Sequence, residues 1–113
     1  MSPHDPLIAF KQMRDHAREA MTLLAGKSRA ALETDRVLSL AVVRLLEILG
    51  EAAGRVPSEM QQRHPSIPWF HIIGMRNRLI HGYDRVDLDI VWAVVVADLP
   101  TLVTRLEEIT AGQ

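Results

Sequence analysis

The residues best suited to chemistry lie together in one short stretch, from Arg76 to Tyr83. Within it, Arg76, Asn77, His81 and Tyr83 supply a fixed cation, an amide, an imidazole and a phenol. A histidine with an ordinary pKa near ~6.5 can take or give a proton at neutral pH. An arginine can hold a phosphate and stabilise the negative charge that builds up on its oxygens. This set favours metal-independent cleavage of RNA, in which the histidine exchanges a proton with a ribose 2′-hydroxyl or a leaving 5′-oxygen.

On a continuous α-helix these side chains would not all face one ligand. Asn77 and His81 are four residues apart and would share a face, whereas about 140° around the axis separates Arg76 from His81. The pair converges only if the helix ends at Ile80 to Gly82, or if a cleft wraps around it, and Gly82 favours such an end. One chain supplies one suitable histidine in this stretch, so a two-fold dimer would be needed to supply both an acid and a base.

Three further residues have roles that depend on this stretch. Arg78 is either a solvated charge or a general contact to RNA phosphate. Glu51 is either a surface charge or an ion-pair partner that supports Arg76, and we favour the partner. Tyr83 follows a glycine, so its hydroxyl is expected to reach solvent. A modification there would add bulk and negative charge beside the arginine and histidine and would block an RNA phosphate.

Composition limits the kind of protein that holds this stretch. The chain has 113 residues, of which 48% are hydrophobic, and a formal net charge of −1. One domain with its own core, residues 1–113, is therefore expected. Between Arg55 and Arg85 five arginines stand against two acidic residues, with three histidines among them. A local basic patch is thus expected, while a non-specific coating of nucleic acid is not.

Several chemistries and locations are disfavoured by what the sequence lacks. There are no cysteines, which excludes disulfides and thiolate chemistry. No carboxylate cluster has convincing metal-ligand spacing, and His64 and His71, seven residues apart, are expected to be surface groups, so no metal is expected. The sequence shows neither a signal peptide nor an apolar run near the ~20 residues that span a bilayer, which makes a cytoplasmic protein the expectation.

The hydrophobic pattern predicts an all-α fold, an up-and-down bundle of four to five helices. The expected elements are a helix over 6–24, a helical turn over 28–33, a long helix from 34 or 35 to about 54, a helix from 68 to about 82, and a last helix from about 87 to 109. The long helix is apolar on more than one side, which suits the centre of a bundle or contact with a second chain. The β-branched run 90–96 resembles a strand, but the helical pattern continues beyond it, and Pro100 is expected to bend that helix.

Particular residues are expected to mark helix ends and close approaches. The expected N-caps are Asp5, followed by Pro6 in the first turn, then Thr34 or Asp35, Ser58 before a short turn, and Asp87. Gly50 and Gly54 would allow another segment to approach the long helix closely. Trp69 and Trp92 are expected to be core or interface anchors.

The stretch and its flanks resemble a known family. Arg76-Asn77-Arg78-Leu79-Ile80-His81-Gly82-Tyr83 matches the R-x4-H-x-Y form of the HEPN signature. The resemblance extends to the HepT-like branch through Gly50-Glu51-Ala52, Ile67-Pro68-Trp69, Gly74-Met75, Val86-Asp87 to Trp92, and Leu99-Pro100. It covers about residues 37–109.

The resemblance implies a specific function. HepT-like proteins are all-α homodimers that act as toxin ribonucleases in toxin–antitoxin pairs. By this match Arg76 and His81 are the catalytic pair at a cleft between subunits, and Asn77 has a supporting role. The implied partner is an MNT-type nucleotidyltransferase antitoxin, which uses ATP to transfer AMP to Tyr83. The protein itself would need no cofactor.

Two other classes of function remain open at the level of sequence. The chain could be a non-catalytic dimeric helical module that docks the nucleotidyltransferase and presents Tyr83 for modification. It could also be a purely structural helical dimer, in which the motif has no chemical role.

Overall fold

The computed structural model describes residues 5–81 and 85–111, and only the backbone of His81. Helices dominate, which confirms the all-α prediction. The elements are α1 (Pro6–Leu24), α2 (Ala31–Thr34), α3 (Arg36–Gly54), α4 (Ser58–Arg63), α5 (Trp69–Ile73), α6 (Met75–Leu79), β1 (Ile80–His81), β2 (Arg85–Val86), α7 (Leu88–Ala93), the π-helical segment η1 (Val94–Asp98) and α8 (Leu99–Thr110). Among the described residues no helix combines the length and apolarity that crossing a membrane requires.

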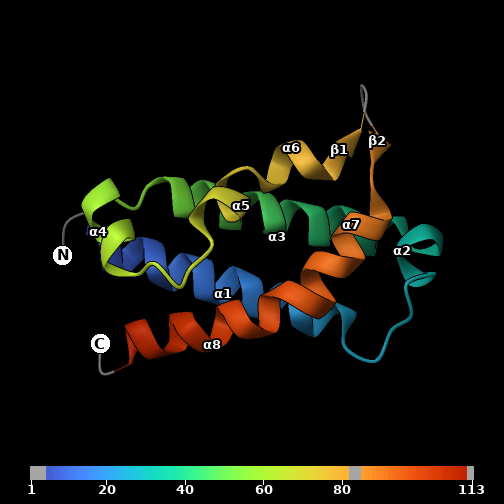
Figure 1. Cartoon of the computed structure of the whole chain (residues 1–113). Helices are drawn as coiled ribbons and strands as arrows, with labels where there is room; N and C mark the ends of the chain where they lie inside the picture. Colours follow the sequence, from blue (N-terminus) through green and yellow to red (C-terminus); the bar gives the residue numbers. More distant parts are fainter. Residues whose placement is uncertain (1–4, 82–84, 112–113) are drawn as a thin grey trace.

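Three long helices form the body of the molecule (Figure 1). α1 packs along both α3 and α8, and the short helices α5 and α6 pack on α3. The start of α1 and the end of α8 lie at the α4 end of the bundle, whereas α2 and the β1–β2 pair lie at the opposite end (Figure 1). The segment 76–81 therefore lies against α3, toward the end of the bundle that carries α2.

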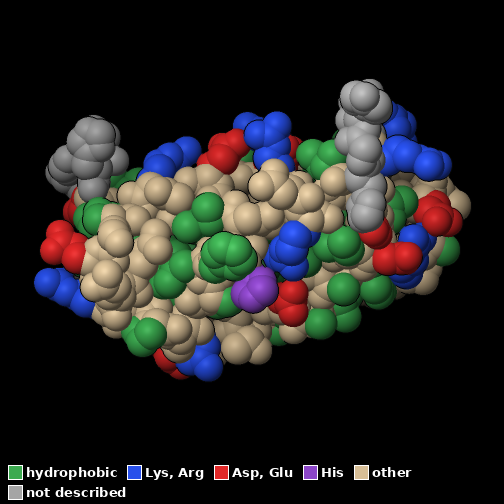
Figure 2. Space-filling view, turned by 45° about the horizontal axis from the view of Figure 1, so that its top comes forward, with side chains coloured by type: hydrophobic (Ala, Val, Ile, Leu, Met, Phe, Trp, Pro, Cys, Tyr) green, Lys and Arg blue, Asp and Glu red, His purple; other side chains and the backbone are tan. Residues whose placement is uncertain are grey.

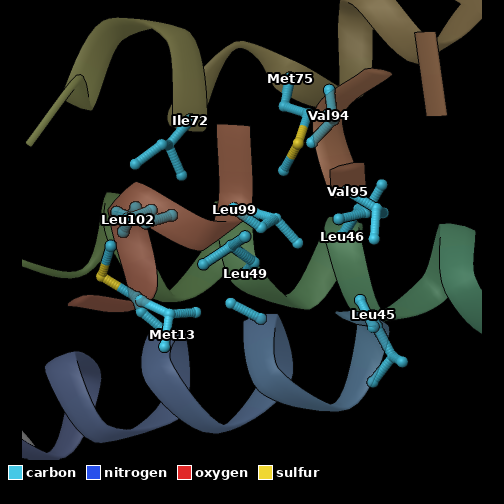
Figure 3. Close-up of a cluster of buried hydrophobic side chains, with 14 of the residues drawn as sticks. Met13, Leu45, Leu46, Leu49, Ile72, Met75, Val94, Val95, Leu99 and Leu102 are labelled. Atoms are coloured by element: carbon cyan, nitrogen blue, oxygen red, sulfur yellow. The ribbon is translucent and has the colours of Figure 1, made fainter. Parts of the chain in front are cut away.

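The core is built from apolar side chains that meet between α1, α3, α6 and α8. Met13 of α1, Leu46 and Leu49 of α3, Met75 of α6 and Leu99 of α8 are all at most 2% exposed, and Figure 3 shows them in one cluster. Burying a side chain of this size contributes about 1.5–3 kcal/mol. Packing therefore fixes α6, which carries the motif arginine, to the rest of the bundle.

Aspartates cap three helices, as predicted. The side chain of Asp5 accepts a hydrogen bond from the N–H of Leu7 at 2.9 Å, before a first-turn proline. Asp35, rather than Thr34, caps α3 by accepting from the N–H of Leu38 at 3.0 Å. Asp87 caps α7 by accepting from the N–H groups of Asp89 and Ile90. Each such cap satisfies backbone donors that the helix itself leaves unpaired.

Two of the local predictions are wrong. Ser58 does not cap α4, because it is the first helical residue and Pro57 precedes it without a side-chain cap. Gly54 has no close neighbour, because a Cβ there would meet nothing within 4 Å. Gly50 behaves as predicted: a Cβ there would lie 3.0 Å from the backbone oxygen of Ile72, where α5 rests on α3.

The run 90–96 is helical, as predicted, and the irregularity at Pro100 takes the form of η1. In a regular α-helix the proline ring would clash with the carbonyl of Val96, and Pro100 has no N–H to donate to it. Just before the proline, the N–H of Leu99 reaches the carbonyl of Val94, five residues back. This wider turn is how the chain accommodates the proline between α7 and α8.

A charged contact ties the loop after α1 to the motif end of the molecule. The guanidinium of Arg29 donates to Glu33 and to Asp89, each at 2.7 Å. These hydrogen bonds, first to Glu33 and then to Asp89, raise the pKa of Arg29 above its ordinary value. Because Asp89 is in the first turn of α7, the contact links α7 to the loop before α2, and α2 packs beside α7.

Candidate functional site

The motif is not on one continuous helix. The helix predicted from Pro68 to Gly82 is wrong in its extent, because α5 ends at Ile73 and a new helix, α6, spans only Met75–Leu79. At the break, a Cβ on Gly74 would lie 3.1 Å from the carbonyl oxygen of Phe70, so glycine suits the tight junction. After Leu79 the chain is extended, with φ −103° and ψ 122° at Ile80.

A short antiparallel pairing replaces the expected last turn of helix. Ile80 pairs with Val86, and the backbone of His81 pairs with Arg85. The N–H of Asp87 donates to the carbonyl oxygen of Leu79 at 2.6 Å, which fixes the chain on its way into α7. The pairing combines residues that come before and after residues 82–84, so the helical pattern of the residues before them did not reveal it.

This geometry changes how the motif residues relate. Asn77 lies on α6 and His81 in β1, so the shared helical face expected for them does not exist. The helix ends at Leu79, one residue before the range Ile80 to Gly82 in which its end was expected. The side chain of His81 and the whole of Tyr83 lie outside the described residues, so their place in the site stays a prediction.

Arg76 is supported by a different carboxylate from the one predicted. Its Nε lies 3.5 Å from Oε2 of Glu47, whereas Glu51 lies 3.5 Å from Arg44, so the predicted pairing of Glu51 with Arg76 is wrong. The reason is the crossing of α6 over α3, which meets α3 one helical turn before Glu51. The side chain of Arg76 is 69% exposed, and an ion pair in such a position is weak. The guanidinium therefore remains accessible to an anionic ligand.

Arg78 points to another part of the surface. Two residues after Arg76 on α6, it is about 200° further around the axis. Its Nη2 donates to the backbone oxygen of His71 at 3.0 Å, and its side chain lines a cavity of about 500 Å³ between α5, α6, η1 and α8. The structure thus separates the two arginines of the motif, while Asn77 lies exposed between them on α6.

The sequence reasoning missed Glu47 and a stripe along α3. Val37, Leu40, Arg44, Glu47 and Glu51 follow one another at steps of three and four residues and so share one face of α3. Four of them are exposed and Glu47 is half-buried beside Arg76. The spacing was readable in the sequence, but without the neighbouring elements nothing indicated that this face is left uncovered.

Fold and site together define a class: a small helical bundle in which the R-x4-H-x-Y motif begins on a short helix beside α3 and continues into a short strand that pairs with Arg85–Val86. The chain belongs to the Ribonuclease HepT-like family, whose model matches residues 13–109. This confirms the resemblance found in the sequence.

Curated relatives agree with the family. The chain is 40% identical over 75 residues to "Probable ribonuclease HepT" of Thermococcus cleftensis, covering 66% of this chain and 68% of that protein. It is 43% identical over 75 residues to a "Putative RNase" of Caldanaerobacter subterraneus subsp. tengcongensis, covering 66% and 67%. A "Putative RNase" of Methanocaldococcus jannaschii is 34% identical over 73 residues, covering 65% and 67%. No solved structure matches the chain significantly.

Proposed function

We propose that this chain is a metal-independent endoribonuclease and the toxin of a toxin–antitoxin pair, with Arg76 and His81 as its catalytic residues. The observation that carries the proposal is the placement of an exposed arginine on α6, whose helix ends at Leu79, two residues before His81. Membership of the Ribonuclease HepT-like family supports the same activity.

The proposed reaction is an internal transesterification of RNA. The ribose 2′-oxygen bonds to phosphorus, its proton passes to a histidine, and the bond from phosphorus to the 5′-oxygen breaks. The leaving oxygen receives a proton from an acid, which gives a 2′,3′-cyclic phosphate and a free 5′-hydroxyl. Arg76 would hold the non-bridging oxygens as charge grows on them, with Asn77 as a neighbouring donor. The carboxylate beside Arg76 is that of Glu47, and not that of Glu51 as expected.

The proposed active form is a homodimer that docks through the α3 stripe. The side chains of Val37 and Leu40 are 78% and 54% exposed, although both are large and apolar and the other faces of α3 pack against the bundle. The positions 37, 40, 44, 47 and 51 repeat as the facing positions of paired helices do. Because Glu47 in this stripe lies beside Arg76, a second copy docked on it would bring two motifs together and supply an acid and a base.

The proposed control is modification of Tyr83. An MNT-type nucleotidyltransferase antitoxin would transfer AMP from ATP to the phenolic oxygen, with pyrophosphate leaving. The added nucleotide would place negative charge and bulk two residues along the chain from His81 and from Arg85, which pair with each other through their backbones. The mass of the intact protein after incubation with this partner and ATP tests it: a gain of AMP that persists in Tyr83→Phe would refute Tyr83 as the sole acceptor.

The test of the nuclease is cleavage of a defined RNA in EDTA. Wild type should cleave and leave a 2′,3′-cyclic phosphate end. His81→Ala and Arg76→Ala should each lower the rate by at least about 100-fold. His16→Ala on α1, whose ring nitrogen contacts the backbone oxygen of Gln12, is the matched control and should cleave as wild type does.

Two results would contradict the nuclease proposal. One is cleavage by His81→Ala at the wild-type rate, which would remove the catalytic assignment. The other is a folded dimer that never cleaves RNA but gains AMP at Tyr83, which is the outcome that a non-catalytic docking module predicts.

A further inference from the structure

The cavity on the far side of α6 from Arg76 has the composition of a nucleotide site. Its volume of about 500 Å³ lies within the ~300–1,000 Å³ usual for small-ligand sites. Its apolar floor consists of buried side chains, Leu49, Ile72, Met75, Leu99 and Leu102. An apolar floor of this kind suits the flat face of a nucleobase.

Charged and polar groups line the rim of the same cavity. Arg78 and Arg105 line it from α6 and α8, and neither guanidinium has an ion-pair partner among the residues that the structure describes. Asp98 and Thr101 add acceptors and one hydroxyl donor. On the face drawn in Figure 2, a histidine near the middle adjoins an acidic side chain, a basic one and several hydrophobic ones.

An exposed aromatic ring lies next to this rim. Phe70 is 86% exposed, and its ring stands edge-on to that of His71, which lines the cavity, with centroids 5.9 Å apart. Proteins that bind single-stranded nucleic acid combine exposed aromatic rings, on which bases stack, with basic side chains that contact the phosphates.

We propose that this cavity binds one nucleotide of single-stranded RNA. This proposal rests on the proposed ribonuclease function. The base lies on the apolar floor, Arg78 and Arg105 bind the adjoining phosphate, and the next base stacks on Phe70. The carboxylate of Asp98 accepts a hydrogen bond from an exocyclic amino group, so adenine, guanine or cytosine fits better than uracil. Since Arg76 and Arg78 lie on opposite sides of α6, this nucleotide belongs to RNA flanking the scissile bond.

A free nucleotide offers the same base and phosphate as a nucleotide within an RNA strand. The role of Phe70 distinguishes these two ligands. A mononucleotide would fill the cavity and leave Phe70 unused, whereas a strand uses both. Phe70→Ala should therefore weaken the binding of RNA about fivefold and leave the binding of 5′-AMP unchanged.

The experiment measures the Kd of a labelled 12-nucleotide RNA and of 5′-AMP, with inorganic phosphate as a third probe, in His81→Ala protein so that RNA stays intact. Thr101→Phe places a ring in the cavity from its exposed rim, and should weaken RNA and 5′-AMP about tenfold or more. Thr104→Phe is the matched control, since Thr104 is also exposed on α8 but does not line the cavity. Thermal melting confirms that both variants fold.

A second pair of variants reports on the phosphate contact. Arg105→Gln should weaken RNA about threefold to fivefold and lower the slope of log Kd against log salt by about 0.7. Arg63→Gln removes the same charge from exposed Arg63 on α4, outside the cavity, and should change the affinity by less than about twofold.

Each outcome bears on the proposal. RNA affinity that is equal in Thr101→Phe and Thr104→Phe overturns it, even if wild type cleaves RNA. Tight 5′-AMP binding that Thr101→Phe abolishes, without any loss of RNA affinity, assigns the cavity to a free nucleotide and also overturns it. If Thr101→Phe weakens RNA binding but wild type never cleaves RNA, the nuclease proposal fails while the nucleotide site stands.

Discussion

Arg76 combines two properties that a phosphate-binding residue needs. Glu47 lies 3.5 Å from its Nε and limits where the side chain rests, yet the side chain is 69% exposed. The pair resembles a resting state in which the carboxylate occupies part of the place that a phosphate would take. Exposed ion pairs contribute only about 0–1 kcal/mol, so a phosphate can displace the carboxylate at little cost.

Removing the competing carboxylate should improve RNA binding. In Glu47→Gln, Arg76 keeps a polar neighbour, and the negative charge that repels RNA is removed. The KM for RNA cleavage should therefore fall about twofold to threefold. The free energy of unfolding should change by less than about 0.5 kcal/mol. Steady-state cleavage and chemical denaturation measure the two quantities.

Glu51→Gln is the control for that variant. It removes the same charge from the same stripe of α3, but Glu51 pairs with Arg44 rather than with Arg76. A KM that falls equally in both variants would show that only the total charge matters, and the specific role of Glu47 would be rejected.

For single residues, the sequence predicts those contacts that form between residues close together along the chain. The caps Asp5 and Asp35 were predictable, because an aspartate side chain bonds to N–H groups only two or three residues ahead. The partner of Arg76 was not, because it depends on where α6 crosses α3. Glu47 and Glu51 are one turn apart on the same face, and only the crossing distinguishes them.

At the scale of elements, the position of α6 depends on how α5 sits on α3. A Cβ at position 50 would lie 3.0 Å from the backbone oxygen of Ile72, a backbone atom that cannot move away by changing a rotamer. α5 leads into α6 through a single residue, Gly74. A displacement of α5 would therefore move the arginine of the motif.

Gly50→Ala should test this packing. Forcing α5 away from α3 should lower the free energy of unfolding by about 1–3 kcal/mol, as overpacking does. RNA cleavage should fall more than the stability loss explains, because Arg76 moves with α6. Urea denaturation and the cleavage rate at a temperature where both proteins are folded separate these effects.

Gly54→Ala, in the same helix, is the matched control. A Cβ there meets nothing within 4 Å, so alanine should leave the stability unchanged or raise it by up to about 1 kcal/mol through its better helix propensity. An equal loss of stability in both variants would mean that helix propensity, and not the contact with α5, explains the effect.

The elements show where a periodic pattern stops being informative. The limits of α1 and α3 follow from apolar spacing, caps and glycine, all of which are local. The end of α6 does not, because Ile80 is extended and pairs with Val86, a residue that lies outside the helical pattern. The π-helical turn before Pro100 was predictable only in part. The proline predicted an irregularity in the helix, but not that it would be a π-helical turn.

At the scale of the whole molecule, one face of α3 is left without cover. α3 packs against α1 on one side and against α5 and α6 on another, while Val37 and Leu40 stay in solvent. An isolated chain gains nothing from two large apolar side chains there. In the proposed dimer, a second copy docked on this face would bury them and bring the second motif beside the first.

Leu40→Glu should therefore separate the proposed dimer into monomers. A charge at a position that faces its own symmetry mate would be repelled by the same charge on the partner, besides losing the buried apolar area. Sedimentation or light scattering should give the mass of one chain, and RNA cleavage should fall by at least about 100-fold, because a monomer offers one histidine instead of an acid and a base.

Val96→Glu is the control, since Val96 is similarly exposed, at 50% against 54% for Leu40, but lies on η1 rather than on α3. It should keep the mass and activity of wild type, which excludes a general effect of a surface glutamate. Full activity in a Leu40→Glu protein that sediments as a monomer would refute the two-chain site. A Leu40→Glu protein that remains dimeric would instead show that the chains associate through another face, and the α3 stripe would have to be abandoned as the interface.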